Sequence, residues 1–385
     1  MKKVFKTLFL LIIVLFSLGQ LQRIQLTEVI SIYAHEIVIS IWLVLVVIKN
    51  TQETIKLAKK LTQNKLLLII FIWIMLGLFI NFLISGFSLI PILYLSRVIS
   101  YALFGISLSI VKPFSIKQQQ HYWFVGGLLV VFWGFLQYFL LPDTRFLRYL
   151  GWDDHYLRLI STQLDPNFTG ILLGVSFFLL QGIKLRPDWT RKVLSLIIAI
   201  AILLTYSRAS YLSFILSSVL LFILYIRKFH KTRLYLLVII GFFILSLPFL
   251  PRAAGEGVKL ERTFSINSRI DSNVQAFEKI DHYQWIIGQG LFTPLGRDQK
   301  LPWMNTAHFP DNLLVFIISS TGIIGLGLFT MILYKSLVFL YTNDIFILSA
   351  FVAILIHSQF NHTLFQPFVW LWISSLVLTQ LEFNT

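Results

Sequence analysis

Apolar segments of about 20 residues recur along almost the whole chain, with polar stretches between them. A helix of that length matches the hydrocarbon thickness of a bilayer, roughly 30 Å. The 385 residues are 57% hydrophobic with a mean hydropathy of +0.80, which leaves too little polar surface to coat a soluble globule. We predict an all-α, polytopic transmembrane helix bundle that forms a single integral membrane domain over residues 1–385. Its predicted spans, about twelve, cover 4–19, 29–48, 66–86, 89–111, 122–141, 167–183, 193–206, 209–226, 234–250, 311–334, 345–360 and 364–381.

The basic residues gather on one predicted side of the membrane. With the N-terminus inside, the cytoplasmic segments hold 19 basic and four acidic residues, whereas the outer segments hold 11 of each. This asymmetry follows the positive-inside rule and predicts that both termini are cytoplasmic. It also accounts for the net charge of +15 without nucleic acid, which is not expected as a partner.

The first residues, MKKVFKTLFLLIIVLFSLG, are similar to a secretory signal. They lack a small-x-small cleavage site and further spans follow at once, so we predict a retained first helix. The chain has no cysteine, which excludes disulfides, thiol catalysis and Cys-ligated metal.

Two predicted outer segments differ from the basic inner loops. The segment of about 142–166 mixes charges with aromatic residues, and we expect it to include an interfacial amphipathic helix. The segment of about 251–310 is the one long hydrophilic stretch in the sequence. Its INSRIDSNVQAFEKI run has helical spacing of apolar residues, which favours an ordered, partly helical extracytoplasmic loop.

Arg208 is the single charged residue between Val193 and Ile226. A straight helix over these 34 residues would be about 51 Å long, too long for one span, so we predict a hairpin broken at TYSRAS. The charge pattern places the break at the outer surface. Two interpretations of Arg208 are open: contact with lipid headgroups, or binding of an anion in a cavity.

Other ionisable residues lie within the predicted spans or on the outer side. Arg97 either forms a structural ion pair with Glu36 or binds substrate. His357 is predicted to be a hydrogen-bonded packing residue. Arginine suits phosphate because its planar fork of donors is always charged, so the outer arginines are candidate anion ligands. These outer arginines are Arg158, Arg208, Arg262 and Arg269.

The stretch AHFPDN precedes a long apolar segment. Asp311 and Asn312 fit the N-cap of a helix, and Asp311 or His308 also fits a general base that accepts a hydroxyl proton. We expect no metal site at Asp153-Asp154-His155, because adjacent residues on a helix point in different directions. Neither a metal nor a cofactor is expected elsewhere.

The order of four motifs resembles the O-antigen polymerase/O-antigen ligase superfamily of bacterial envelope enzymes. The motifs are RLISTQLDPNFTGILLG, LLTYSRASYL, NSRIDSNVQAFEKIDHYQWIIGQG and AHFPDNLLVFIISSTGIIGL, spread over residues 155–335. The resemblance implies that Arg208 and Arg269 bind the diphosphate of a polyprenyl-linked donor, with Arg158 and Arg97 as further candidates. The ligases place a histidine directly before the Asn that here is Asn312. This chain has Asp311 at that position and His308 three residues earlier, so the identity of the base stays open.

The resemblance further implies an enzyme in the bacterial cytoplasmic membrane with its active site on the extracytoplasmic side. The expected function is polymerisation of polyprenyl-diphosphate-linked oligosaccharides for capsule, exopolysaccharide or O-antigen, by inverting, metal-independent transfer. Alternatives are a ligase that transfers finished glycan and, from another class, a lipid-linked sugar flippase. Expected partners are the lipid-linked oligosaccharide, the bilayer, and assembly proteins such as a flippase and a chain-length regulator.

Overall fold

The computed structural model describes residues 1–385 except 28–29, 230–232, 253–255, 262, 295–308 and 381–385. Each of the twelve predicted apolar segments forms a helix, so the expectation of a helical bundle is confirmed. These helices are α1 (Lys2–Ser17), α2 (Ala34–Lys49), α4 (Lys65–Ser85), α5 (Leu89–Val111), α6 (Ile116–Leu140), α7 (Pro166–Gly182), α8 (Asp188–Leu204), α9 (Arg208–Phe229), α10 (Leu234–Ser246), α13 (Leu313–Asn343), α14 (Ile345–His357) and α15 (Pro367–Leu378).

Fewer helices meet the length and composition needed to span a membrane than the sequence predicts. Within the described residues, five helices are long and apolar enough to cross a bilayer: α4, α5, α6, α9 and α13. A sixth span exists if α2 and the next helix, α3 (Thr51–Gln63), count as one, although they meet at a bend of 104°. Four further apolar helices have 10–17 residues. The protein is therefore an integral membrane protein, and the count of about twelve spans stays a prediction.

Helix α7 lies at the centre of the bundle. Fourteen of its 17 residues are buried, and α7 packs against α6, α8, α9 and α14. A helix that is apolar on every side is expected at such a position. Close packing with α9 depends on Gly170, since a Cβ there would lie 2.3 Å from Ser210 Oγ. Small residues of this kind allow helices in membranes to approach closely.

Two short strands correct the all-α prediction. Strands β1 (Arg23–Gln25) and β2 (Ser31–Tyr33) form an antiparallel hairpin, so the predicted span 29–48 becomes helical only at Ala34. Helix α2 begins there because Glu36 Oε2 accepts a hydrogen bond of 2.8 Å from the Tyr33 N–H. This contact caps the helix at the hairpin.

The segment 142–166 does not contain the predicted amphipathic α-helix. It forms two 3-10 turns, Arg145–Leu150 and Ser161–Gln163, with an isolated antiparallel bridge between Asp143 and Tyr156. The N–H and the hydroxyl of Thr144 each donate to the carbonyl of His155 at 2.9 Å. These contacts across the segment satisfy backbone groups that a helix would otherwise use.

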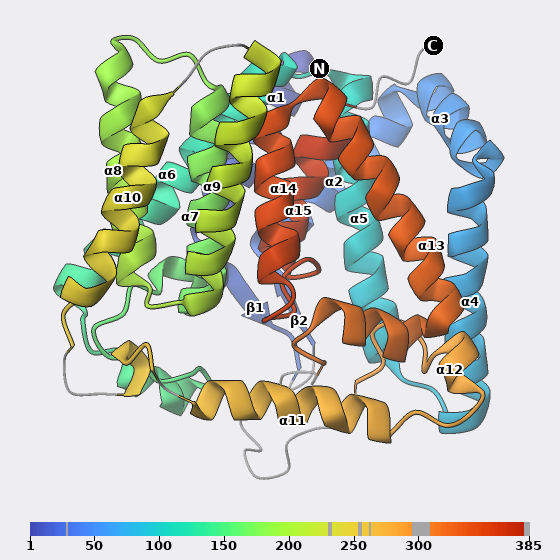
Figure 1. The fold of residues 1–385 in the computed structure, drawn as a ribbon. Helices are drawn as coiled ribbons and strands as arrows, with labels where there is room; N and C mark the ends of the chain where they lie inside the picture. Colours follow the sequence, from blue (N-terminus) through green and yellow to red (C-terminus); the bar gives the residue numbers. More distant parts are fainter. Residues whose placement is uncertain (28–29, 230–232, 253–255, 262, 295–308, 381–385) are drawn as a thin grey trace.

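The helix predicted within 251–310 is confirmed as α11 (Phe264–Glu278), followed by the short α12 (Gln284–Ile287). Figure 1 shows α11 lying across the end of the bundle opposite the N-terminus. The Gly-x-Gly after α12 contacts a break in α13 at Gly322, where the N–H groups of Gln289 and Gly290 donate to the carbonyls of Ser319 and Ser320. A Cβ on Gly288 would lie 2.3 Å from the Ser320 backbone, so glycine is required for this approach.

Candidate active site

The predicted break at TYSRAS is confirmed, since α8 ends at Leu204 and α9 begins at Arg208. Thr205 Oγ1 donates to the Ile202 carbonyl and accepts from the Ser207 N–H, at 2.7 and 3.2 Å. Such local bonds from Ser and Thr compete with the helical pattern. Between them, Tyr206 adopts a positive φ of 53°, a conformation that costs a non-glycine residue about 1–2 kcal/mol.

Arg158 stabilises this break. It is 6% exposed, and its Nε and Nη2 donate to the carbonyls of Thr205 and Tyr206 at 3.0 and 3.4 Å. The Tyr206 hydroxyl donates to the Pro251 carbonyl at 2.6 Å and so joins the turn to the loop after α10. The structure therefore gives Arg158 a role in holding the turn, while its predicted contact with a diphosphate stays a prediction.

Pro166-Asn167, from the first of the four motifs, contacts the Ser-Arg turn directly. Ser207 Oγ donates to Asn167 Oδ1 at 2.8 Å, and Ser210 Oγ donates to the Asn167 carbonyl at 3.3 Å. Asp165 caps the same end of α7 by accepting from the N–H groups of Asn167 and Phe168. The N-termini of α7 and α9 therefore lie side by side. The partial positive charge of such ends attracts anions.

Arg208 is the first residue of α9, and Arg269 of α11 lies near enough for the two charges to influence each other. Arg208 Nη1 donates to the Leu260 carbonyl at 3.0 Å, and Arg269 Nη2 donates to Asn361 Oδ1 at 2.9 Å. The pKa of Arg269 is lowered mainly by burial. The carboxylate of Asp311 opposes this shift, the charge of Arg208 adds to it, and Asp165 opposes it again. These four groups, from α7, α9, α11 and the start of α13, therefore share one electrostatic environment.

Asp311 directly precedes the N-cap of α13. The N-cap itself is Asn312, whose Oδ1 accepts from the N–H groups of Leu314 and Val315 at 2.9 and 3.1 Å. Capping is thus performed by Asn312, while Asp311 lies near enough to influence Arg269. His308 lies outside the described residues. The choice between Asp311 and His308 as base stays a prediction.

Arg97 has a different environment from the other candidates. Its Nε donates to Glu36 Oε1, and its Nη2 contacts Glu36 Oε2 and the Ser31 carbonyl at 3.3 and 3.1 Å. Tyr101 also donates to Glu36 Oε1, at 2.7 Å. Arg97 therefore forms the ion pair with Glu36, which is one of its two predicted roles. The other role, substrate binding, stays a prediction. A small cavity of about 180 Å³ lies beside the pair.

A buried polar network joins the Ser-Arg turn to Arg269, and the sequence did not indicate it. His357 Nε2 lies 3.2 Å from Ser210 Oγ, and His357 Nδ1 lies 2.6 Å from Thr363 Oγ1. Thr363 in turn donates from its N–H to the Asn361 carbonyl at 2.7 Å. The prediction that His357 is a hydrogen-bonded packing residue is confirmed. The available signal was the polar run HSQFNHT between two apolar helices, and its contact with Arg269 was not apparent from it.

The fold and this site define a polytopic membrane protein with clustered arginines and a carboxylate at one end of its bundle. Residues 193–330 match the family model described as O-antigen ligase. The matched segment contains Arg208, Arg269 and Asp311. The match confirms the resemblance to the O-antigen polymerase/O-antigen ligase superfamily and supports glycan transfer of that type on a lipid-linked oligosaccharide. No curated protein and no solved structure matches the chain.

Proposed function

We propose that the protein is a polysaccharide polymerase that joins oligosaccharide repeat units carried on polyprenyl diphosphate. The observation that carries the proposal is the convergence of Arg208 and Arg269 at the paired N-termini of α7 and α9. A diphosphate needs fixed positive charge as it leaves, and preorganised donors contribute most to such reactions.

In the proposed reaction, a hydroxyl of the acceptor sugar attacks C1 of the donor sugar from the side opposite the diphosphate. Asp311, or His308 in its place, takes the hydroxyl proton. The new glycosidic bond forms as the bond from C1 to the diphosphate oxygen breaks, which inverts the anomeric centre. Arg208 and Arg269 neutralise the leaving diphosphate, so the mechanism requires no metal. Arg158 and Arg97 contact the diphosphate only if they exchange their present partners.

A ligase that transfers finished glycan to another acceptor is the second candidate, because the matched family carries that description. The two activities use the same donor chemistry and differ in the acceptor. We place the protein in the bacterial cytoplasmic membrane with both termini inside. The loops at the termini end of the bundle carry the basic excess, which supports this orientation.

The test replaces Arg269 with Ala and follows polymer length and lipid-linked intermediates in cells. We expect polymer to fall at least 100-fold at normal abundance in the membrane, the size of effect seen when one transition-state donor is removed. Arg145→Ala is the matched control, since Arg145 is exposed on the same end and pairs with Asp143. Arg208→Lys is expected to restore little activity, because an ammonium cannot replace a bidentate fork.

If the Arg269→Ala protein is present in the membrane at normal abundance and makes normal polymer, the assignment of the site is wrong. The intermediate that accumulates separates the two candidates. Single repeat units on lipid support the polymerase, whereas full-length polymer retained on lipid supports the ligase.

A further inference from the structure

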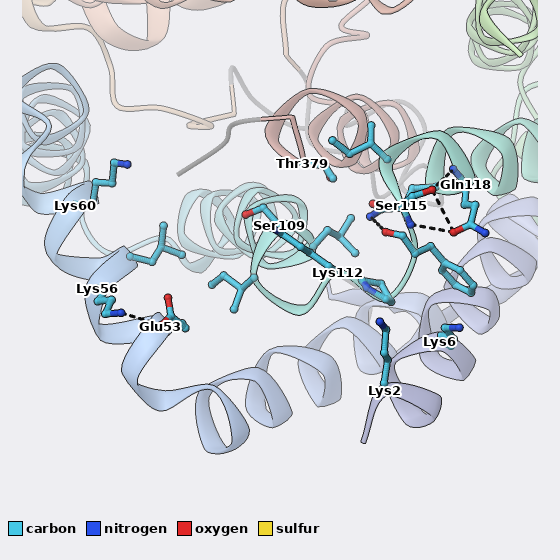
Figure 2. A pocket seen from close by; sticks show the side chains of 17 residues that line it. Lys2, Lys6, Glu53, Lys56, Lys60, Ser109, Lys112, Ser115, Gln118 and Thr379 are labelled. Carbon is cyan, nitrogen blue, oxygen red and sulfur yellow. Dashed lines mark hydrogen bonds and ion pairs between the residues drawn. The ribbon is translucent and has the colours of Figure 1, made fainter. Parts of the chain in front are cut away.

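A cavity of about 800 Å³ lies at the end of the bundle opposite the candidate active site. It is bounded by the start of α1, by α3, by the turn between α5 and α6, and by Thr379 after α15 (Figure 2). This volume lies within the range of small-molecule sites, roughly 300–1,000 Å³. The cavity shares no residue with the cluster around Arg208 and Arg269, so glycan transfer leaves it without a function.

The lining of the cavity is strongly basic. Five lysines and a single carboxylate line it within the described residues. The lysines are Lys2, Lys6, Lys56, Lys60 and Lys112, and the carboxylate is Glu53. Figure 2 shows that these lysines come from three separate elements around the hollow, with Lys56 joined to Glu53. Convergence from α1, α3 and the end of α5 is not required by the positive-inside rule, which concerns only the side of the membrane.

Helix α3 places the cavity at the membrane interface. It follows α2 after the 104° bend, none of its residues is buried, and its sequence TQETIKLAKKLTQ separates basic from apolar residues at helical spacing. A helix with this pattern lies in the plane of the interface. The lining also includes apolar side chains, which suit the start of an acyl chain. These are Leu57, Ile110, Phe114 and Ile116.

Gln119 provides a second, independent sign of a ligand. Its side chain lines the cavity and is 4% exposed, and its Nε2 donates to the Phe114 carbonyl at 2.9 Å. Within the described part of the chain, its Oε1 is buried without a hydrogen-bond partner. A buried acceptor in that state costs about 1–3 kcal/mol, which a hydroxyl donor in the cavity would recover.

We propose that this cavity binds the headgroup of an anionic glycerophospholipid of the phosphatidylglycerol type. The lysines neutralise its phosphate, and a headgroup hydroxyl donates to Gln119 Oε1. Basic pockets between transmembrane helices bind anionic lipid in this way, with each lysine near the surface adding to the affinity. A free anion would use the polar side chains of the cavity and would leave its apolar lining without a partner.

The experiment compares two double variants with the same loss of charge. Lys6→Gln with Lys56→Gln removes one cavity lysine from α1 and one from α3. Lys3→Gln with Lys59→Gln removes exposed lysines from the same two helices that do not line the cavity. Each full-length protein is placed in nanodiscs of phosphatidylglycerol and phosphatidylcholine, and the lipid retained after release is counted by native mass spectrometry.

We expect the cavity variant to retain phosphatidylglycerol with about tenfold lower affinity than the unaltered chain, and the control to stay within about twofold. Equal losses in both variants would overturn the proposal, because they would indicate general surface charge. Inorganic phosphate that displaces the retained lipid completely from the unaltered protein would overturn it too, as the site would then be one for small anions. Melting temperatures in phosphatidylcholine alone show whether either variant is misfolded. If the cavity variant is misfolded, the Lys112→Gln variant is used in its place.

Discussion

Arg97 and Arg269 are both partly buried arginines, and the structure treats them in opposite ways. The guanidinium of Arg97 meets the carboxylate of Glu36 through two donors, and that carboxylate also accepts from the Tyr33 N–H and the Tyr101 hydroxyl. The guanidinium of Arg269 is held by the neutral amide of Asn361. In the described ranges of the chain, no carboxylate lies within 4 Å of Arg269.

This difference separates a structural arginine from a binding one. An internal carboxylate compensates the charge of Arg97 at contact distance, so that arginine stabilises the junction of the hairpin, α2 and α5. Among the described residues, the carboxylates that oppose the charge of Arg269 are Asp311 and Asp165, both beyond contact distance, and Arg208 adds a second positive charge. An arginine held by a neutral amide, with the charge of Arg208 nearby, favours an anionic ligand, which is the reason for assigning the diphosphate to this end of the molecule.

The largest expected effect is on stability, from removal of Arg97. Breaking a largely buried pair leaves a charge behind, so we expect Arg97→Ala to lower the free energy of unfolding by about 3 kcal/mol. The measurement is thermal unfolding in detergent together with abundance in the membrane. The double variant Arg97→Met with Glu36→Leu removes both charges and is expected to recover most of the loss. If the double variant is abundant yet makes no polymer, Arg97 also binds substrate, and the comparison with Arg269 fails.

The next largest effect is expected on activity, from a substitution that gives Arg269 a carboxylate partner like the one Arg97 has. Asn361→Asp gives Arg269 a carboxylate at contact distance, so we expect activity to fall about 30-fold or more while hydrogen exchange in α11 slows. Asn267→Asp adds the same charge at an exposed position of α11 and is expected to leave activity within about twofold. Full activity in Asn361→Asp would mean that the charge of Arg269 is not used by the substrate.

The smallest effect concerns the network behind Arg269. Thr363→Val keeps the shape of the side chain but removes the hydroxyl beside His357 Nδ1, at a cost of about 1–2 kcal/mol for the buried nitrogen left unsatisfied. We expect a fall of a few degrees in melting temperature and a loss of activity of about fivefold, because the loop that holds Asn361 is loosened. Thr330→Val, which removes an exposed hydroxyl bonded within its own helix, is the control. An unchanged melting temperature in Thr363→Val would show that the network does not support the site.

Much of the fold was predictable because hydropathy is a local property. A run of apolar residues must be helical in a bilayer to satisfy its own backbone, so the twelve helical segments followed from the sequence. The break before Arg208 was predictable from the length of the apolar run, and α11 from the helical spacing of its apolar residues. The β1–β2 hairpin and the turns of 142–166 were not, because their backbone groups are satisfied by partners elsewhere in the chain, as Thr144 is by His155.

The sequence was enough to predict the arginines of the site, but not the residues that they contact. Arg208, Arg269 and Asp311 were singled out by residue type and motif order, and the structure brings them to one end of the bundle. Asn361 was missed because it lies 92 positions from Arg269, and an amide has no distinctive local pattern. Whether Arg97 pairs or binds was equally open, since its partner Glu36 lies 61 positions away.

The sequence by itself determined that this protein is a helical membrane protein with its basic loops at one end and a set of arginines near the other. Composition and charge are enough for this, because the bilayer imposes the same requirement on every apolar segment. Only the tertiary structure decided which arginine meets a carboxylate and which meets an amide, and that α1, α3 and the end of α5 surround a basic cavity. The energy of a charge depends on its neighbours within a few ångströms, and in a bundle those neighbours come from distant segments of the chain.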